Sequence, residues 1–206
     1  EGGRLLALAY PDRVGKRRPG DTPRYQLSNG KGALLREDDG LARHEWLVAA
    51  DLDGKAREAR IYLAAPVDLL TLETDLVAHI RDQNEAEWDD KRGTVVARKT
   101  RRLGALLLAE KPLTKPSPEL IQQGLLKAVQ RKGLDNLPWT SAARQWQARV
   151  ALLARHFPGQ WPDVSEQALT ESLEHWLAPF LSGISRWSEL GKMNLQNALN
   201  SLLEYP

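Results

Sequence analysis

The sequence predicts an α+β protein in which a small five-stranded β-barrel and a short β extension precede an all-α helical domain. Two observations predict this class. Between residues 13 and 66, short runs of alternating apolar and polar residues are separated by turn residues, as in β-strands. After residue 117, apolar residues recur every three or four positions, as on one face of a helix. The segment Lys111–Pro118, which has three prolines, separates the two patterns and marks a boundary.

The barrel strands are predicted from the alternation and from the turns between them. Residues 3–10 have helical character, and Pro11 ends that helix because it has no N–H to continue the hydrogen-bond ladder. Strands follow at residues 13–18, 24–28, 32–36, 44–53 and 61–66, and a helix over 68–80 would close the barrel. Asn29-Gly30 predicts a primed hairpin turn, since both residues tolerate positive φ angles, and Asp53-Gly54 predicts another turn.

The alternation also predicts which side chains share a face. One face of the fourth strand holds Trp46, Val48, Ala50 and Leu52, and one face of the fifth holds Ile61, Leu63 and Ala65. A five-stranded barrel of this kind is typical of the oligonucleotide-binding (OB) fold. Such barrels hold nucleic acid in a charged groove and carry out no reaction on it.

The β extension and the helical domain follow the barrel. Strands are predicted at Glu85–Asp90, Thr94–Thr100 and Leu103–Ala109, and Asp-Lys-Arg-Gly forms the turn between the first two. Helices are predicted from Ser117 to Gly133, from Thr140 or Ser141 to Phe157, from Ser165 to Gly183, and over 186–191 and 194–203. The predicted parts are therefore the OB-like barrel with its closing helix at 13–82, the β extension and linker at 83–116, and the helical C-terminal domain at 117–206.

Composition and motifs exclude several kinds of chemistry. The chain has 206 residues, a net charge of +2 and no cysteine, so disulfides and thiolate metal sites are impossible. No apolar run approaches the ~20 residues that span a bilayer, so no membrane association is predicted. No phosphate-binding loop is present, and the four histidines have no metal-ligand spacing. We therefore predict no catalytic residue, no metal site and no cofactor on this chain.

Basic residues gather in two places although the net charge is small. The first cluster extends over the first strand, the loop after it and the start of the second strand, with Arg13, Lys16, Arg17, Arg18 and Arg24. The second runs from Lys91 to Arg102 without an acidic residue. By strict alternation, Arg98 and Arg102 share one face of a strand, and Lys99 and Arg101 share the other, so neither face is a dry core there. The predicted contacts to RNA phosphates are Arg13, Lys16, Arg17, Arg18, Arg98, Lys99, Arg101 and Arg102. The other interpretation, that these residues only keep strand edges solvated, stays open.

Tryptophan is frequent, with seven residues, and most positions favour packing over ligand contact. Trp46 and Trp176 fall on apolar stripes and are predicted core residues. Trp88 lies beside the basic hairpin and is the possible site of stacking on a base.

Seven segments carry a resemblance in their order and spacing: GRLLALAYPDRV, RYQLSNGKGA, ARHEWLVAADLDG, RIYLAAPVD, WDDKRGTVVARKTRRLGALLLAEKPL, GLDNLPWTSAARQWQARV and LEHWLAPFLSG. Together they resemble the bacterial DExH-box ATP-dependent RNA helicases of the HrpB family, in the region C-terminal to the motor domains. The resemblance covers most of the chain.

The resemblance implies that two RecA-like motor domains lie upstream in the same protein and that the family sequence continues past Pro206. It implies that residues 1–12 end a helical-bundle domain and that the barrel contacts single-stranded RNA. ATP and Mg are implied as cofactors of the longer protein, which would hydrolyse NTP in the cytoplasm. None of the motor motifs is on this sequence, so no ATPase residue is predicted.

Charge and resemblance together predict an accessory region that binds single-stranded nucleic acid without sequence preference and assists the motor. An alternative stays open: a protein-interaction or regulatory domain that docks on the motor or on another partner, with no direct RNA contact. The oligomeric state also stays open.

Overall fold

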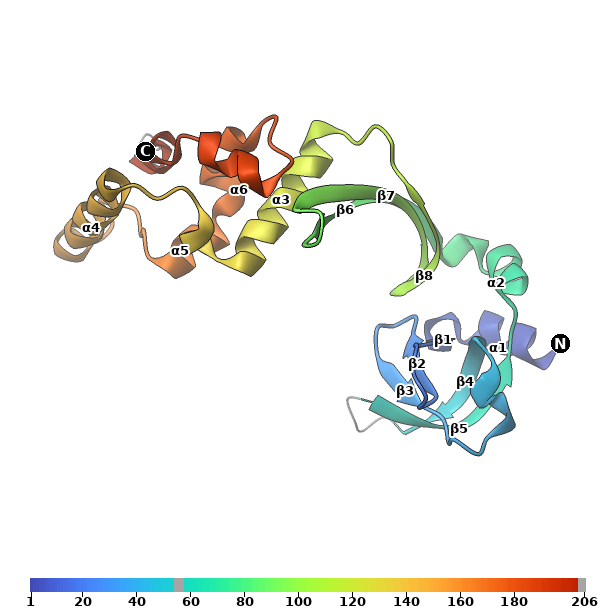
Figure 1. Ribbon diagram of the computed structural model, residues 1–206. Helices are drawn as coiled ribbons and strands as arrows, with labels where there is room; N and C mark the ends of the chain where they lie inside the picture. The colour runs from blue at the N-terminus through green and yellow to red at the C-terminus, as the bar shows by residue number, and fades with distance from the viewer. Residues whose placement is uncertain (54–57, 204–206) are drawn as a thin grey trace. The chain divides into compact units, whose positions relative to one another are not determined.

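The computed structural model describes residues 1–53 and 58–203 and confirms the α+β class (Figure 1). The chain divides into two compact units, which we call the barrel unit (Glu1–Gln83 with Lys99–Lys111) and the helical unit (Asn84–Arg98 with Pro112–Pro206). Of the predicted turn Asp53-Gly54, Gly54 lies outside the described residues. The four-part division predicted above stays a prediction.

The N-terminal barrel has five strands and is closed, as predicted. Its strands are β1 (Val14–Arg17), β2 (Arg24–Leu27), β3 (Gly32–Leu34), β4 (Trp46–Leu52) and β5 (Glu58–Pro66). Their order around the barrel is β1-β2-β3-β5-β4, and β1 pairs with β4 to close it. All pairs are antiparallel except β3 with β5, which is parallel. Two 3-10 turns, η1 (Pro11–Arg13) and η2 (Gly40–Arg43), connect elements in this part of the chain.

On β4, the barrel interior is filled from the face opposite Trp46 and Val48. Leu47 and Ala49 are buried in the same cluster as Tyr25 of β2, which the structure places fully inside. Trp46 and Val48 are buried as well, but in a second cluster outside the barrel. The first half of β4 is thus apolar on both faces, so alternation alone does not determine which face lines the interior.

The predicted face of β5 is corrected. Ile61 is buried as expected, but Leu63 is 61% exposed. The register between β4 and β5 shifts twice, pairing Ala49 with Ala64 and Leu52 with Ile61. An extra residue in a strand reverses which side chains face inward beyond it. Ala64, rather than Leu63, therefore packs against the interior cluster.

The hairpin at Asn29-Gly30 exists, but it is not a primed two-residue turn. Gly30 has a φ of +88°, whereas no non-glycine residue that the structure describes has a positive φ. The Leu27 N–H donates to the Lys31 carbonyl (2.8 Å), which leaves three residues in the loop. A three-residue hairpin needs positive φ at one position only, and glycine supplies it.

Two helices cover the outside of the barrel. They are α1 (Gly2–Ala9) and α2 (Leu69–Asp75), the latter followed by the 3-10 turn η3 (Val77–His79). Pro11 follows α1, as predicted, and the Asp68 carboxylate caps α2 by accepting from the Thr71 N–H at 2.7 Å. Ala7 and Leu72 join Trp46 in the outer cluster. The helix predicted to close the barrel is thus α2 with η3.

The second sheet has three strands in the order β6 (Ile80–Asp89), β7 (Thr94–Leu103) and β8 (Leu106–Pro112). The turn at 90–93 is as predicted, with Gly93 at a φ of +60°. The strand predicted over Leu103–Ala109 is wrong at its start, because β7 runs through Leu103 and β8 begins only at Leu106. An apolar run contains no sign of a turn, and Gly104 is what breaks it.

The turn between β7 and β8 packs tightly on the hairpin between β2 and β3. The Ala105 N–H donates to the Ser28 carbonyl at 2.8 Å. Gly104 has a φ of +55°, and a Cβ there would lie 2.2 Å from the same carbonyl oxygen. Only glycine allows both the conformation and the approach. This contact lies wholly within the barrel unit.

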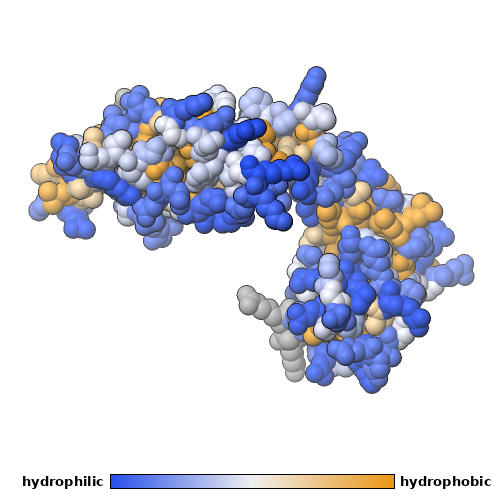
Figure 2. Space-filling view, in the orientation of Figure 1, coloured by the Kyte–Doolittle hydropathy of each residue, from blue (hydrophilic) through white to orange (hydrophobic). Residues whose placement is uncertain are grey.

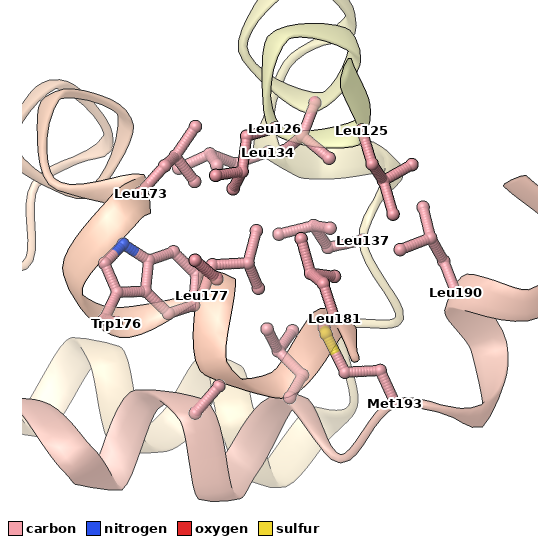
Figure 3. Packing of buried hydrophobic residues seen from close by; sticks show 14 of the residues in the cluster. Leu125, Leu126, Leu134, Leu137, Leu173, Trp176, Leu177, Leu181, Leu190 and Met193 are labelled. Carbon is pink, nitrogen blue, oxygen red and sulfur yellow. The ribbon is translucent and has the colours of Figure 1, made fainter. Parts of the chain in front are cut away.

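The helical unit surrounds a single hydrophobic cluster (Figure 3). Its elements are α3 (Pro118–Lys132), η4 (Leu134–Asn136), α4 (Ser141–His156), α5 (Glu166–Glu171), α6 (Leu173–Trp176), η5 (Ala178–Leu181), η6 (Trp187–Lys192), α7 (Leu195–Asn200) and η7 (Ser201–Leu203). The side chains of the predicted caps Ser117 and Thr140 each accept a hydrogen bond from the backbone N–H three residues later. Gly133 ends α3 with a φ of +90°. The predicted core residue Trp176 is 1% exposed and lies among leucines in Figure 3.

The single helix predicted from Ser165 to Gly183 is instead three short pieces, α5, α6 and η5. The Ser172 hydroxyl donates to the Ala168 carbonyl at 2.7 Å where α5 ends. Serine side chains compete with the backbone for such carbonyls and disturb helices. Pro179 then lies in the first turn of η5, where a missing N–H costs little.

We expect Gly104→Ala to destabilise the barrel unit by roughly 2–4 kcal/mol, because the new Cβ meets the Ser28 carbonyl and left-handed φ is unfavourable for alanine. Gly30→Ala is the matched control in the same unit, since its φ is +88° and the added Cβ would meet Ala105 at an ordinary contact distance of 3.9 Å. This control carries the conformational cost alone, about 1 kcal/mol. Urea unfolding of both variants measures the difference, and equal midpoints would contradict the close contact.

Candidate nucleic-acid interface

Two residues of the first basic cluster are held by contacts inside the barrel unit. Arg13 Nη1 donates to the Ala50 carbonyl at 2.9 Å, and its guanidinium lies 4.7 Å from the ring centre of Tyr10. Lys16 Nζ donates to the Leu107 carbonyl at 3.1 Å and lies 4.9 Å from the Trp46 ring. These bonds fix both cations at the barrel surface, and part of each side chain stays accessible.

The next two cations of that cluster are less constrained. Arg17 is the last residue of β1, and its Nη2 donates weakly to the Gly20 carbonyl at 3.5 Å. Arg18 is exposed and forms no side-chain hydrogen bond or ion pair within the described part of the chain. Lys16, Arg17 and Arg18 are thus three successive cations at the end of β1, of which Lys16 also lies 3.9 Å from the Glu45 carboxylate.

The second basic cluster is partly neutralised by carboxylates. Arg101 pairs with Asp82 at 2.9 Å and lies 3.9 Å from Glu73. The hydrogen bond from Arg101 lowers the pKa of Asp82, and the nearby charges of Lys99 and Lys111 act in the same direction. This side of the strand is a mixed ion-pair surface.

Lys99 and Arg101 line the same surface, as predicted, but the expectation that neither face is a dry core there is wrong. Thr100 and Leu103 are both 2% exposed, so the strand end does contain buried positions. Arg98 and Lys99 are exposed one after the other, before buried Thr100. Arg98 and Arg102 each interact with other residues, and Arg102 Nη1 lies 3.5 Å from the Ala105 carbonyl.

Trp88 is partly buried and packs within the helical unit. Its ring lies 5.4 Å from that of Trp187, edge to face, and its Nε1 donates to Asp90 at 3.0 Å. Lys132 Nζ lies 5.9 Å from the Trp88 ring and 2.8 Å from Asp90. Both the indole N–H and one edge are therefore engaged, and stacking on a base stays a prediction.

The sequence reasoning missed a positively charged hollow in the barrel unit. A cavity of about 300 Å³ lies between the β2–β3 hairpin, the start of β6 and the end of β7. Its lining includes Arg81, Arg102 and His79. Arg81 belongs to neither basic cluster, because it stands alone in the sequence between a predicted helix and a predicted strand. Only the strand pairing brings it beside Arg102.

Within residues 1–53 and 58–203, no group of three or more metal-binding side chains is close enough to hold an ion. The same residues include no helix that is both long and apolar enough to cross a membrane.

Known proteins that are similar to this chain belong to the class of DExH-type helicases. Residues 79–113 match a family model described as "ATP-dependent RNA helicase HrpB, connector region". Two solved structures are similar, one titled as an E. coli DExH-box NTPase and one as an Escherichia coli DEAH/RHA helicase. Their identities are 37% and 34% and their TM-scores 0.68 and 0.67. Each alignment covers 98% of this chain and 25% of the solved chain. The chain is thus related to part of a DExH-type helicase.

The particular relative is HrpB. The chain is 39% identical over 204 residues to ATP-dependent RNA helicase HrpB of Escherichia coli (strain K12), and both structures bear that name. The match covers 98% of this chain, so the resemblance inferred from the sequence is confirmed. The chain spans about a quarter of the length of the relatives it matches.

The pair Asp82–Arg101 gives a test by pH. The pKa of Asp82 is lowered in the fold, so its contribution to stability is present above its unfolded value of about 3.9 and is lost as pH falls through the lower folded pKa. We expect Asp82→Asn to unfold more easily than the parent chain at pH 7, by a small margin because the pair is exposed.

The difference should vanish at a pH below the folded pKa of Asp82, which urea unfolding across the pH range measures. Asp21→Asn is the control, because Asp21 is exposed and its side chain has no ion pair within the described residues. A difference that persists in acid would show that the pair does not account for it.

Proposed function

We propose that this chain is an accessory region of an ATP-dependent RNA helicase related to HrpB. It binds single-stranded RNA without sequence preference and helps the motor hold its strand. The observation that carries the proposal is the run of cations Lys16, Arg17 and Arg18 at the end of β1 in a closed five-stranded barrel. A barrel of the OB type with cations along one strand suits a phosphate backbone.

The predicted RNA contacts do not carry equal weight. Arg13 and Lys16 already donate to backbone carbonyls at 2.9 and 3.1 Å. Arg18 and Arg17 lead the first cluster, because Arg18 has no side-chain hydrogen bond among the described residues and the bond of Arg17 is long, at 3.5 Å. In the second cluster, Arg101 is proposed as a weaker contact because it pairs with Asp82, and Lys99 and Arg102 are proposed beside it. Arg98 completes the proposed set, and Trp88 is kept as a possible stacking residue.

The activity of the longer protein is part of the same proposal. ATP hydrolysis with Mg would take place on two RecA-like domains elsewhere in that protein, which would act in the cytoplasm. The relative's name, ATP-dependent RNA helicase, supports this, as does the connector-region match. No residue of this chain is assigned to the hydrolysis step.

One observation favours the rival function, docking on the motor or on another protein. Leu5, Leu8, Leu70 and Val77 are each at least half exposed, on the neighbouring helices α1 and α2 and on η3. Figure 2 shows hydrophobic residues gathered where α2 lies. An exposed apolar patch of this kind suits a protein partner better than RNA.

The double variant Arg17→Gln, Arg18→Gln tests RNA binding by the barrel. Each phosphate contact to a single strand contributes about 0.7 to the slope of log affinity against log salt. We expect the variant to bind an oligouridine more weakly and with a slope shallower by about 1.4. Fluorescence anisotropy over a range of KCl concentrations measures both quantities.

Lys127→Gln with Arg155→Gln is the control, since it removes two exposed charges from the helical unit. It should leave the slope unchanged. If the parent chain forms no complex with oligouridine even at low salt, the RNA-binding proposal is wrong and the docking function is favoured.

A further inference from the structure

The hollow next to the β2–β3 hairpin has the size and polarity of a ligand site. Its volume of about 300 Å³ is at the lower end of the ~300–1,000 Å³ that is usual for small-ligand pockets. All of its lining residues belong to the barrel unit, and four separate segments of the chain supply them. Because Gly104 packs directly on Ser28, the hairpin and the β7–β8 turn are fixed relative to each other at the floor of this hollow.

The charge in the hollow is positive. Arg81 and Arg102 supply two guanidinium groups, against the one carboxylate of Asp12. The Arg81 side chain is exposed and has no hydrogen bond or ion pair with any residue that the structure describes. An arginine fork without a carboxylate partner is suited to bidentate binding of a phosphate.

Neutral donors complete the lining. The Asn29 Oδ1 accepts from the Lys31 N–H at 3.0 Å, which fixes the amide with its NH₂ group available as a donor. His79 and the side chain of Gln83 also line the hollow. Such groups bind hydroxyls or base edges, which a bare inorganic anion does not have.

The opposite side of β6 and β7 carries both positive and negative side chains. Asp82 and Arg101 pair there, and Lys99, Glu110 and Lys111 line the same surface. Cations and carboxylates alternate on that side, so a phosphate would meet repulsion as well as attraction. On the side that carries Arg81, this arginine has no carboxylate partner among the described residues.

We propose that this hollow binds one ribonucleotide unit of an RNA strand, with Arg81 and Arg102 on its phosphate and with Asn29 and Gln83 on its sugar or base. The inference builds on the proposed RNA binding by the barrel and adds a defined subsite with residues outside the two basic clusters. Asp12 weakens the subsite by its negative charge.

Titration with uridine 5′-monophosphate, followed by NMR of the Asn29 and Gln83 side-chain amides, tests the subsite. We expect saturable shifts at millimolar ligand, and a roughly tenfold weaker affinity for Arg81→Glu, which exchanges attraction for repulsion. Asp12→Asn should bind about threefold more tightly, the effect of removing one unit charge ~6 Å away in water. A gain of affinity cannot arise from a folding defect.

Arg60→Glu is the matched charge reversal, since Arg60 is an exposed residue of the barrel unit that does not line the hollow. It should bind the nucleotide like the parent chain. The absence of shifts in the parent chain, or equal binding by Arg81→Glu, would overturn the subsite. Inorganic phosphate that binds as tightly as the nucleotide would overturn the role of Asn29 and Gln83.

The two proposals fail in different ways. If oligouridine does not bind but the mononucleotide does, the RNA-binding function is wrong and the hollow's assignment to an RNA strand is wrong with it, but the nucleotide contacts stand. If oligouridine binds with the expected salt slope and Arg81→Glu binds it like the parent chain, the subsite is wrong and the function stands.

Discussion

A backbone hydrogen bond from Ala105 to Ser28, at 2.8 Å, determines where the β7–β8 turn meets the barrel. Gly104 permits it, because any larger residue would place an atom on the Ser28 carbonyl. Leu103 and Leu106, on either side of this turn, are buried with Trp46 in the outer cluster. The barrel, α2 and the tip of the second sheet therefore form one packed body, and the hollow that holds Arg81 and Arg102 exists because of that packing.

The distribution of acidic residues matters as much as that of the basic ones. Six cations between Lys91 and Arg102 suggest a uniformly positive strand in the sequence. In the fold, Asp82 and Glu73 come to one side of it from other elements. The positive charge proposed to attract RNA therefore cannot be counted from the cluster alone, because Arg101 is paired, whereas Arg81 outside the cluster has no carboxylate partner among the described residues.

Much of the fold could be predicted from the sequence, because turn residues and caps act locally. Pro11, Gly93, Ser117, Thr140 and Gly133 all end or begin elements where expected. The faces of β4 and β5 could not be predicted, because Trp46 and Val48 pack under helices from other parts of the chain and a register shift reverses β5 near Tyr62. Alternation in sequence carries no information about either effect.

The candidate site was predicted only in part for the same reason. Clusters of cations can be seen in a sequence, so Lys16, Arg17 and Arg18 were found. The pairing of neighbouring strands brings Asp82 opposite Arg101 and places Arg81 beside Arg102. A local sequence pattern does not predict which residues of two strands become neighbours. The resemblance to HrpB supplied the family but no information on which cations are paired.

The three-stranded sheet, unlike the barrel, has two open edges, β6 and β8. The end of β8 is exposed and reads Glu110, Lys111, Pro112. Charged residues and a proline on an edge strand hinder another chain from adding to the sheet, since proline offers no N–H and buried charge is costly. The end of β8 is thus unfavourable for hydrogen bonding to a strand of another molecule, which disfavours aggregation at this edge of the sheet.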